Sequence, residues 1–113
     1  MNLLLFSSQD YSSGNEITIT GRRFKHLKTI LKVDVGDSID AGKIGGLMGK
    51  AYVTSINQGA VKLKPVLKSI PPDKLQLSLI MALPRPKMLA RILRNISASG
   101  ISRLHIINCR KVE

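Results

Sequence analysis

The order of apolar and polar positions predicts a first folded unit over residues 1–68. Short alternating segments separated by turn residues are typical of half-buried strands, which we expect at 2–6, 16–20, 38–41, 49–57 and 60–66. Between the second and third strands, a helix is predicted to begin at Arg22. The apolar face of that helix would hold Phe24, Leu27, Ile30 and Leu31. Five short strands and a single helix favour a small β-barrel whose helix covers one end.

A different pattern begins after residues 69–73, a predicted linker with two successive prolines that favour an extended backbone. The apolar run 75–83 is typical of a strand buried on both faces. A helix is predicted over 87–99, with Pro86 in its first turn and Gly100 at its end. Its apolar face would hold Met88, Leu89, Ile92 and Ile96.

A second apolar segment, 104–108, completes a strand–helix–strand order, which predicts parallel strands joined by a right-handed crossover. Two parallel strands and one helix cannot cover both faces of an apolar strand. We therefore expect the unit over 74–113 to be incomplete: either the chain is the front part of a longer protein, or a partner chain supplies the rest. The expected fold class is α+β, a small β-barrel with one helix followed by an incomplete α/β unit.

Composition indicates a folded protein of a reducing compartment. The chain is 43% apolar and 22% charged, so it can build a core, and its single cysteine, Cys109, excludes an internal disulfide. The first residues lack the positive segment of a signal peptide, and no apolar run approaches the roughly 18 residues of a membrane span. We expect a cytoplasmic protein with no membrane partner.

Charge indicates a polyanionic partner. The chain has 18 Lys and Arg residues against 7 Asp and Glu residues, a net charge of +11, which favours nucleic acid over a merely soluble basic surface. The positive residues are spread along the chain, which disfavours a juxtamembrane block. One basic zone covers 22–32, and another covers 74–112, where no acidic residue occurs. Two zones in different structural contexts predict a binding surface with two parts.

The first basic zone supplies most of the candidate RNA contacts. Such cations either solvate a helix face or contact phosphates, which positions RNA without reading its sequence. With no nucleophile or metal cluster nearby, the histidine of this zone is assigned to RNA contact or structure before catalysis. The candidates are Arg22, Arg23, Lys25, His26, Lys28 and Lys32.

The second zone adds Arg85 and Lys87, which lie between the end of a predicted parallel strand and a helix, where α/β folds place ligands. Arg110 holds the corresponding position after the second strand. Arg91 and Arg94 continue a stripe from Lys87 that could equally be a solvated face. His105, in an apolar strand, is expected to be a partly buried structural residue.

The remaining chemistry-bearing residues predict neither catalysis nor metal binding. Two histidines and one cysteine do not have the spacing of a zinc site. The glycines between 42 and 49 do not match a phosphate-binding loop and fit a barrel turn. The few aromatic residues form no stacking platform, so recognition should rest on charge and shape. Catalytic residues stay unassigned.

Residues 26–37, HLKTILKVDVGD, resemble the helix-and-turn motif of RsmE-like ribosomal RNA methyltransferases, in which a histidine precedes apolar and basic residues and a closing Gly-Asp. The glycine-rich turn and the strand 75–84 running into Lys87-Met88 continue the resemblance in the same order. The resemblance implies a PUA-like barrel that holds RNA, followed by a SPOUT-type methyltransferase domain with a C-terminal knot. Members use S-adenosylmethionine to methylate N3 of a uridine in small-subunit ribosomal RNA and act as homodimers through the SPOUT domain.

On this resemblance, 1–68 would be the PUA-like RNA-binding barrel and 74–113 the N-terminal part of a truncated SPOUT domain. The cofactor pocket of the family would lie beyond residue 113. We therefore expect no cofactor-binding residue within this chain, no S-adenosylmethionine binding by the chain alone, and no methyl transfer without the missing part. The alternative is a stand-alone basic RNA-binding adaptor without catalysis, whose strand–helix–strand unit mediates assembly.

Overall fold

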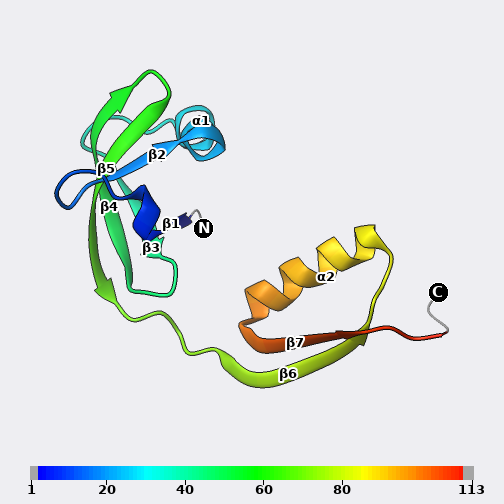
Figure 1. The fold of residues 1–113 in the computed structure, drawn as a ribbon. Helices are drawn as coiled ribbons and strands as arrows, with labels where there is room; N and C mark the ends of the chain where they lie inside the picture. Colours follow the sequence, from blue (N-terminus) through cyan, green and yellow to red (C-terminus); the bar gives the residue numbers. More distant parts are fainter. Residues whose placement is uncertain (1–2, 111–113) are drawn as a thin grey trace. The chain divides into compact units, whose positions relative to one another are not determined.

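A computed structural model describes residues 3–110 and divides the chain into two compact units that meet at Pro71 and Pro72 (Figure 1). The first unit contains β1 (Leu3–Phe6), the short 3-10 helix η1 (Ser8–Asp10), β2 (Ile17–Thr20), α1 (Gly21–Thr29), β3 (Ser38–Lys43), β4 (Met48–Asn57) and β5 (Ala60–Ser69). The second unit contains β6 (Leu75–Ala82), α2 (Pro86–Ser99) and β7 (Ile101–Ile107). Because β5 runs through Ser69, the loop between the units covers 70–74 instead of 69–73.

The first unit is a mixed five-stranded sheet with the order β1-β3-β4-β5-β2. β1 pairs with β3 in parallel, and the other neighbours are antiparallel. Within residues 3–110, no ladder joins the edge strands β1 and β2, so the small β-barrel expected from the sequence has the form of an open half-barrel. The parallel pair forms because the connection from β1 to β3 passes through β2 and α1, as parallel strands need a long crossover.

The core lies on the concave side of this sheet and follows the strand alternation. Inward positions are apolar and outward positions are polar or exposed, as in a sheet with one buried face. The helix α1 and the turn that follows it add two more buried side chains to this core, Leu27 and Val33. The buried residues are Leu4, Phe6, Ile17, Ile19, Leu27, Val33, Ala41, Ala51, Val53, Val61 and Leu63.

The long β4–β5 hairpin bends at two register shifts, one of them between Met48 and Gly49. A Cβ atom at Gly49 would lie 2.2 Å from the carbonyl oxygen of Val66, so the two backbones meet where only glycine fits. Pro65 is buried within β5, and the strand continues past the predicted end at residue 66. The bend lets one continuous hairpin contribute to both ends of the half-barrel.

The predicted apolar face of α1 is wrong at one position. Leu27 is buried, and Phe24 and Leu31 pack against the core, but Ile30 is 65% exposed. Ile30 is the C-cap residue and keeps helical backbone, with its amide hydrogen donated to the His26 carbonyl oxygen, so its exposure reflects its position at the edge of the apolar face, about 60° from Leu27. Lys32 then adopts a left-handed backbone with φ 51°, and the chain turns toward β3.

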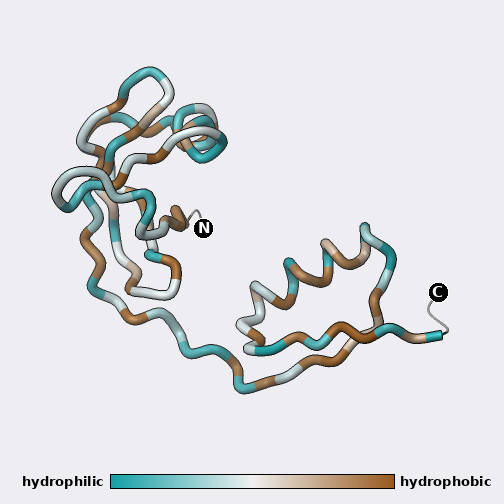
Figure 2. Tube along the Cα trace, viewed as in Figure 1, coloured by the Kyte–Doolittle hydropathy of each residue, from teal (hydrophilic) through white to brown (hydrophobic). Residues whose placement is uncertain are grey.

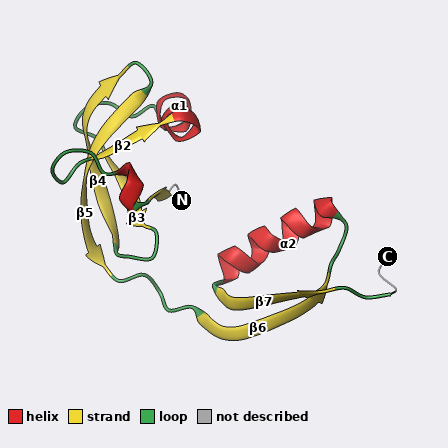
Figure 3. Cartoon of the chain, in the orientation of Figure 1, coloured by secondary structure: helices red, strands yellow, loops and turns green. Residues whose placement is uncertain are grey.

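In the second unit, β6 and β7 pair in parallel, and α2 covers one face of this two-stranded sheet (Figures 1 and 3). Gly100 ends α2 in the left-handed conformation, as predicted, and leads directly into β7. That strand therefore begins at Ile101, three residues earlier than expected. Leu75 donates its amide hydrogen to the carbonyl oxygen of Gly100 at 2.8 Å, which sets the register of the pair.

No residue between 72 and 110 is fully buried. Both strands are mainly apolar (Figure 2), yet Ile80 is 65% exposed, because α2 covers only one side of the sheet. Two sequence expectations are wrong here. Met88 is exposed, and the partly buried face of α2 is Leu89, Ile92 and Ile96. His105 is exposed because it lies in a strand that has too little cover to bury it.

Candidate functional site

A cavity of about 510 Å³ opens between β1 and α1 of the first unit. One side is apolar, formed by leucines of β1 with Leu31 and Ile39, and the other is formed by α1. The helix contributes Arg22, Arg23, His26 and Leu27. The cavity therefore combines an apolar wall with a cationic rim, and no acidic side chain is among its lining residues.

Helical geometry divides the predicted basic residues of this segment. At about 100° per residue, Arg22, Arg23 and His26 share one side of α1 with Leu27, and they line the cavity. Lys25 and Lys28 lie on the other side of the helix, away from the cavity. Lys32 lies beyond the helix end. The structure thus brings three of the six candidates together and separates the other three from them.

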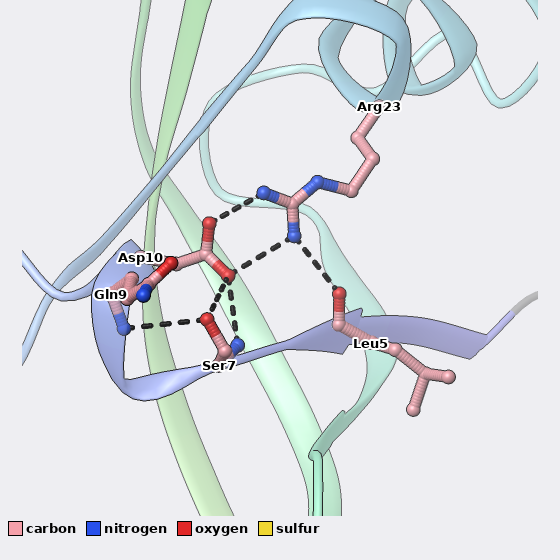
Figure 4. A network of polar contacts seen from close by, with 5 residues as sticks. All are labelled: Leu5, Ser7, Gln9, Asp10 and Arg23. Atoms are coloured by element: carbon pink, nitrogen blue, oxygen red, sulfur yellow. Dashed lines mark hydrogen bonds and ion pairs between the residues drawn. The ribbon is translucent and has the colours of Figure 1, made fainter.

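Arg23 connects α1 to the end of β1 (Figure 4). One guanidinium nitrogen donates to the Leu5 carbonyl oxygen and to Asp10 Oδ2, each at 3.1 Å, and the other donates to Asp10 Oδ1. Asp10 also accepts the Ser7 amide hydrogen at 2.8 Å and so completes the capping of η1. The hydrogen bond from Arg23 is the largest influence that lowers the pKa of the Asp10 carboxyl. Because Asp10 already compensates the charge of Arg23, this arginine mainly fixes the position of the helix and is not a free cation for a ligand.

The parallel strands of the second unit place the candidate cations of the second basic zone near one another. Arg85 precedes the first turn of α2, where its carbonyl oxygen accepts the amide hydrogens of Met88 and Leu89. Lys87 lies in that first turn, and Arg110 follows β7. All three are exposed. Since the carboxyl ends of parallel strands lie at one edge, these cations belong to the same edge of the two-stranded sheet.

The sequence interpretation missed the apolar side of the cavity. Leu3 and Leu5 point away from the core side of β1, and their exposure is 37% and 51%. The available signal was the run Leu3–Phe6, which is apolar at consecutive positions although β1 is an edge strand. It also missed an outward row of Lys62, Lys64 and Lys68 on β5, whose spacing of two and then four residues was visible in the sequence.

Residues 3–110 contain no cluster of three or more His, Cys, Asp or Glu side chains able to hold a metal ion. Within the same range, no helix is long and apolar enough to cross a membrane.

No family model matches the chain. Ribosomal RNA small subunit methyltransferase E of Treponema pallidum is 32% identical over 109 residues, which are 95% of this chain and 41% of that protein. The enzyme of the same name from Neisseria gonorrhoeae, solved bound to S-adenosyl methionine, superimposes with a TM-score of 0.76 at 14% identity over 100% of this chain and 48% of its own. A predicted RNA methyltransferase from Thermotoga maritima has a TM-score of 0.65 at 17% identity over 97% of this chain and 50% of its own.

The chain thus spans between two fifths and one half of these relatives. The low-identity structures establish a common fold, and the Treponema pallidum protein adds similarity in sequence along nearly the whole chain. In sequence and in fold, the chain is therefore RsmE-like: it is similar, along nearly its whole length, to part of a ribosomal RNA small subunit methyltransferase E.

Proposed function

We propose that the chain is the RNA-holding front part of a methyltransferase that modifies N3 of a uridine in small-subunit ribosomal RNA. The observation that carries the RNA-binding part is the uncompensated charge of the first basic zone. Among residues 3–110 only two ion pairs form, Arg23–Asp10 and Lys50–Asp40, so the exposed Arg22 and Lys25 and the half-buried Lys28 have no acidic partner there. Such charge attracts phosphates and releases their counterions.

In this proposal the two units have separate roles. The first is a PUA-like domain that holds RNA through the α1 cations, and the second begins a SPOUT-type catalytic domain that forms a homodimer. Arg85, Lys87 and Arg110 extend the RNA surface at the strand ends of the second unit. Holding the RNA is a contribution to catalysis in itself, because a correctly placed base reacts with a much smaller loss of entropy.

The methyl donor S-adenosylmethionine does not fit the described residues of the second unit. A site for such a cofactor is an enclosed pocket that covers most of the ligand, whereas none of the side chains between 72 and 110 is fully buried. We therefore assign no cofactor contact to the described residues of the second unit. The relatives are about twice as long, which supports placing the cofactor site in sequence that this chain does not include.

RNA binding is tested by fluorescence anisotropy of the chain with a labelled small-subunit RNA hairpin over a series of salt concentrations. The affinity should fall steeply with salt, and Arg22→Gln should reduce the slope of log K against log salt by about 1. Lys50→Gln is the matched control, because Lys50 is paired with Asp40 at 2.8 Å and should change the slope less. An affinity that does not depend on salt would refute the proposal.

Catalysis is tested with radiolabelled S-adenosylmethionine and unmodified small-subunit RNA. The chain alone should transfer no methyl group, whereas a protein that includes the remaining half found in the relatives should methylate uridine N3, seen by mass spectrometry of nucleosides. Transfer by the chain alone would contradict the division of roles. RNA binding without methylation by the longer protein would favour the adaptor alternative, which the same α1 charge supports.

A further inference from the structure

We propose that the cavity between β1 and α1 binds one unstacked nucleotide of single-stranded RNA, with its base against the leucines of β1 and its phosphate at Arg22. The inference rests on the proposed RNA binding and narrows it, because it names which form of RNA the first unit selects and where one nucleotide is held.

The apolar wall is the first argument. Alternation places Leu4 and Phe6 in the core and places Leu3 and Leu5 on the opposite face of β1. Leu3 and Leu5 from that second face line the cavity together with Leu4 from the core face, as expected at the free edge of an edge strand, and Leu3 and Leu5 stay exposed. Apolar surface in a concave site is characteristic of ligand contact. A planar base is a suitable occupant because both of its faces can lie against apolar side chains.

The rim is the second argument. Arg22 and His26 are four residues apart on α1, so their side chains are neighbours on the same side of the helix. An arginine binds phosphate through two parallel hydrogen bonds, and a histidine ring can stack on an unstacked base. Arg23 is fixed between them by Asp10, which keeps the helix at a constant distance from β1. The rim therefore matches the phosphate and the second face of the base, which are the two parts of a nucleotide that the leucine wall does not contact.

Size and charge select the form of RNA. The cavity, about 510 Å³, is within the range of roughly 300–1,000 Å³ that small-molecule sites occupy, so it suits one nucleotide and not a duplex. A paired base cannot enter without leaving its stack, which costs a few kcal/mol. Charge alone would make no such distinction, because a duplex carries the denser phosphates. Preference for single strands is therefore the signature of the cavity.

The test compares a fluorescein-labelled uridine-rich single strand with an RNA duplex of equal length, again by anisotropy. Leu5→Thr introduces a β-branched residue, which is well suited to a strand, but removes the apolar side chain from the cavity wall. It should weaken single-strand binding about tenfold, as loss of one base contact does, and change duplex binding less than about twofold. Ile44→Thr is the matched control, since Ile44 is 64% exposed and lies outside the cavity, and it should change neither affinity.

His26 provides a second pair of variants. His26→Ser should lower the single-strand preference, and His26→Phe, which keeps a ring that can stack, should restore it. A measurement on the unmodified chain makes the test independent of variant folding: uridine 5′-monophosphate should shift the amide NMR signals of β1 and α1.

Three outcomes overturn the inference. Equal losses of affinity for the single strand and the duplex in Leu5→Thr would mean that the cavity does not contact a base. The proposed function, RNA binding through charge, would still stand. Nucleotide-induced shifts confined to other elements would place the contact elsewhere. Binding of neither RNA by the unmodified chain would refute this inference together with the proposed function.

Discussion

Arg23 donates hydrogen bonds to both carboxylate oxygens of Asp10, and this pair joins α1 to the turn that follows β1. The same arginine reaches the Leu5 carbonyl oxygen at 3.1 Å, so it also holds the edge strand itself. The Asp10 side chain is only 14% exposed, and the contact is therefore better shielded from water than an ordinary surface ion pair. The pair positions the two elements that form the cavity.

Removing this contact should cost stability. Arg23→Met keeps much of the side-chain volume and leaves the Asp10 carboxylate without its strongest donor, so we expect a loss of roughly 1 kcal/mol in the free energy of unfolding. Lys50→Met is the matched control, because the Lys50–Asp40 pair has both side chains about half exposed and should contribute little. Urea denaturation followed by circular dichroism measures both. Equal losses in the two variants would contradict the role given to Arg23.

The same pair should make stability depend on pH in the acid range. The pKa of Asp10 is lowered from the ordinary 3.8, mainly by the hydrogen bond from Arg23. Its contribution is therefore complete above about pH 4 and is lost as the pH falls through the lower, folded-state pKa. Asp10→Asn, which cannot ionise, should melt at a lower temperature near neutral pH and should lose less stability on acidification. The test is the melting temperature of the unmodified chain and of Asp10→Asn between pH 6 and 2.5. If the two melting temperatures fall in parallel with pH, Asp10 does not cause the pH dependence.

Two glycines of the sheet should respond in opposite ways to one added methyl group. Gly49→Ala would place a Cβ atom 2.2 Å from the Val66 carbonyl oxygen and should cost about 3 kcal/mol, because backbone must move. In Gly42→Ala the added Cβ atom meets side-chain atoms at 3.5 and 3.6 Å and the Leu47 carbonyl oxygen at 3.9 Å, all ordinary contacts, so the change should be neutral or slightly stabilising. Thermal unfolding of the two variants provides the comparison. A Gly49→Ala protein as stable as Gly42→Ala would mean that the hairpin does not bend where the structure has it.

Lys32 should separate the effect of charge from that of backbone strain. Its left-handed conformation, φ 51°, costs an L-amino acid about 1 kcal/mol. Lys32→Gly removes both the charge and this strain, whereas Lys32→Ala removes the charge and keeps the strain. We expect the glycine variant to be more stable than the alanine variant by roughly 0.5–1 kcal/mol, while the two bind RNA with equal affinity. Equal melting temperatures would contradict the left-handed turn.

The sequence predicts the elements that depend on local patterns. Alternation located the strands of the first unit, and Gly100 marked the end of α2, because left-handed backbone and strand periodicity are both local properties. Helical spacing predicted burial wrongly at Ile30 and Met88, both of which lie at helix ends and are exposed. The last or first turn of a helix need not follow the face of its middle, so spacing there indicates burial poorly.

The relationships that form the candidate site are not local. The parallel direction of β1 against β3 depends on the whole intervening segment, and no alternation pattern encodes it. For the same reason, the contact between Arg23 and Asp10 could not be read from the sequence, in which Arg23 is one of five closely spaced cations. The basic residues were visible in advance, but which of them face the apolar wall became clear only from the relation of β1 to α1.

The pairing of β1 with β3 also has a consequence for the order of folding. The β4–β5 hairpin joins neighbouring segments and can close early, whereas β1 must wait until β2, α1 and β3 have been synthesised. Chain closure over that distance makes β1 a late strand to dock, as is β2, which must wait for β5. The leucines that line the cavity therefore stay unpaired on the nascent chain until β3 has been synthesised, and the surface proposed to receive a nucleotide is also one that a chaperone would cover during synthesis.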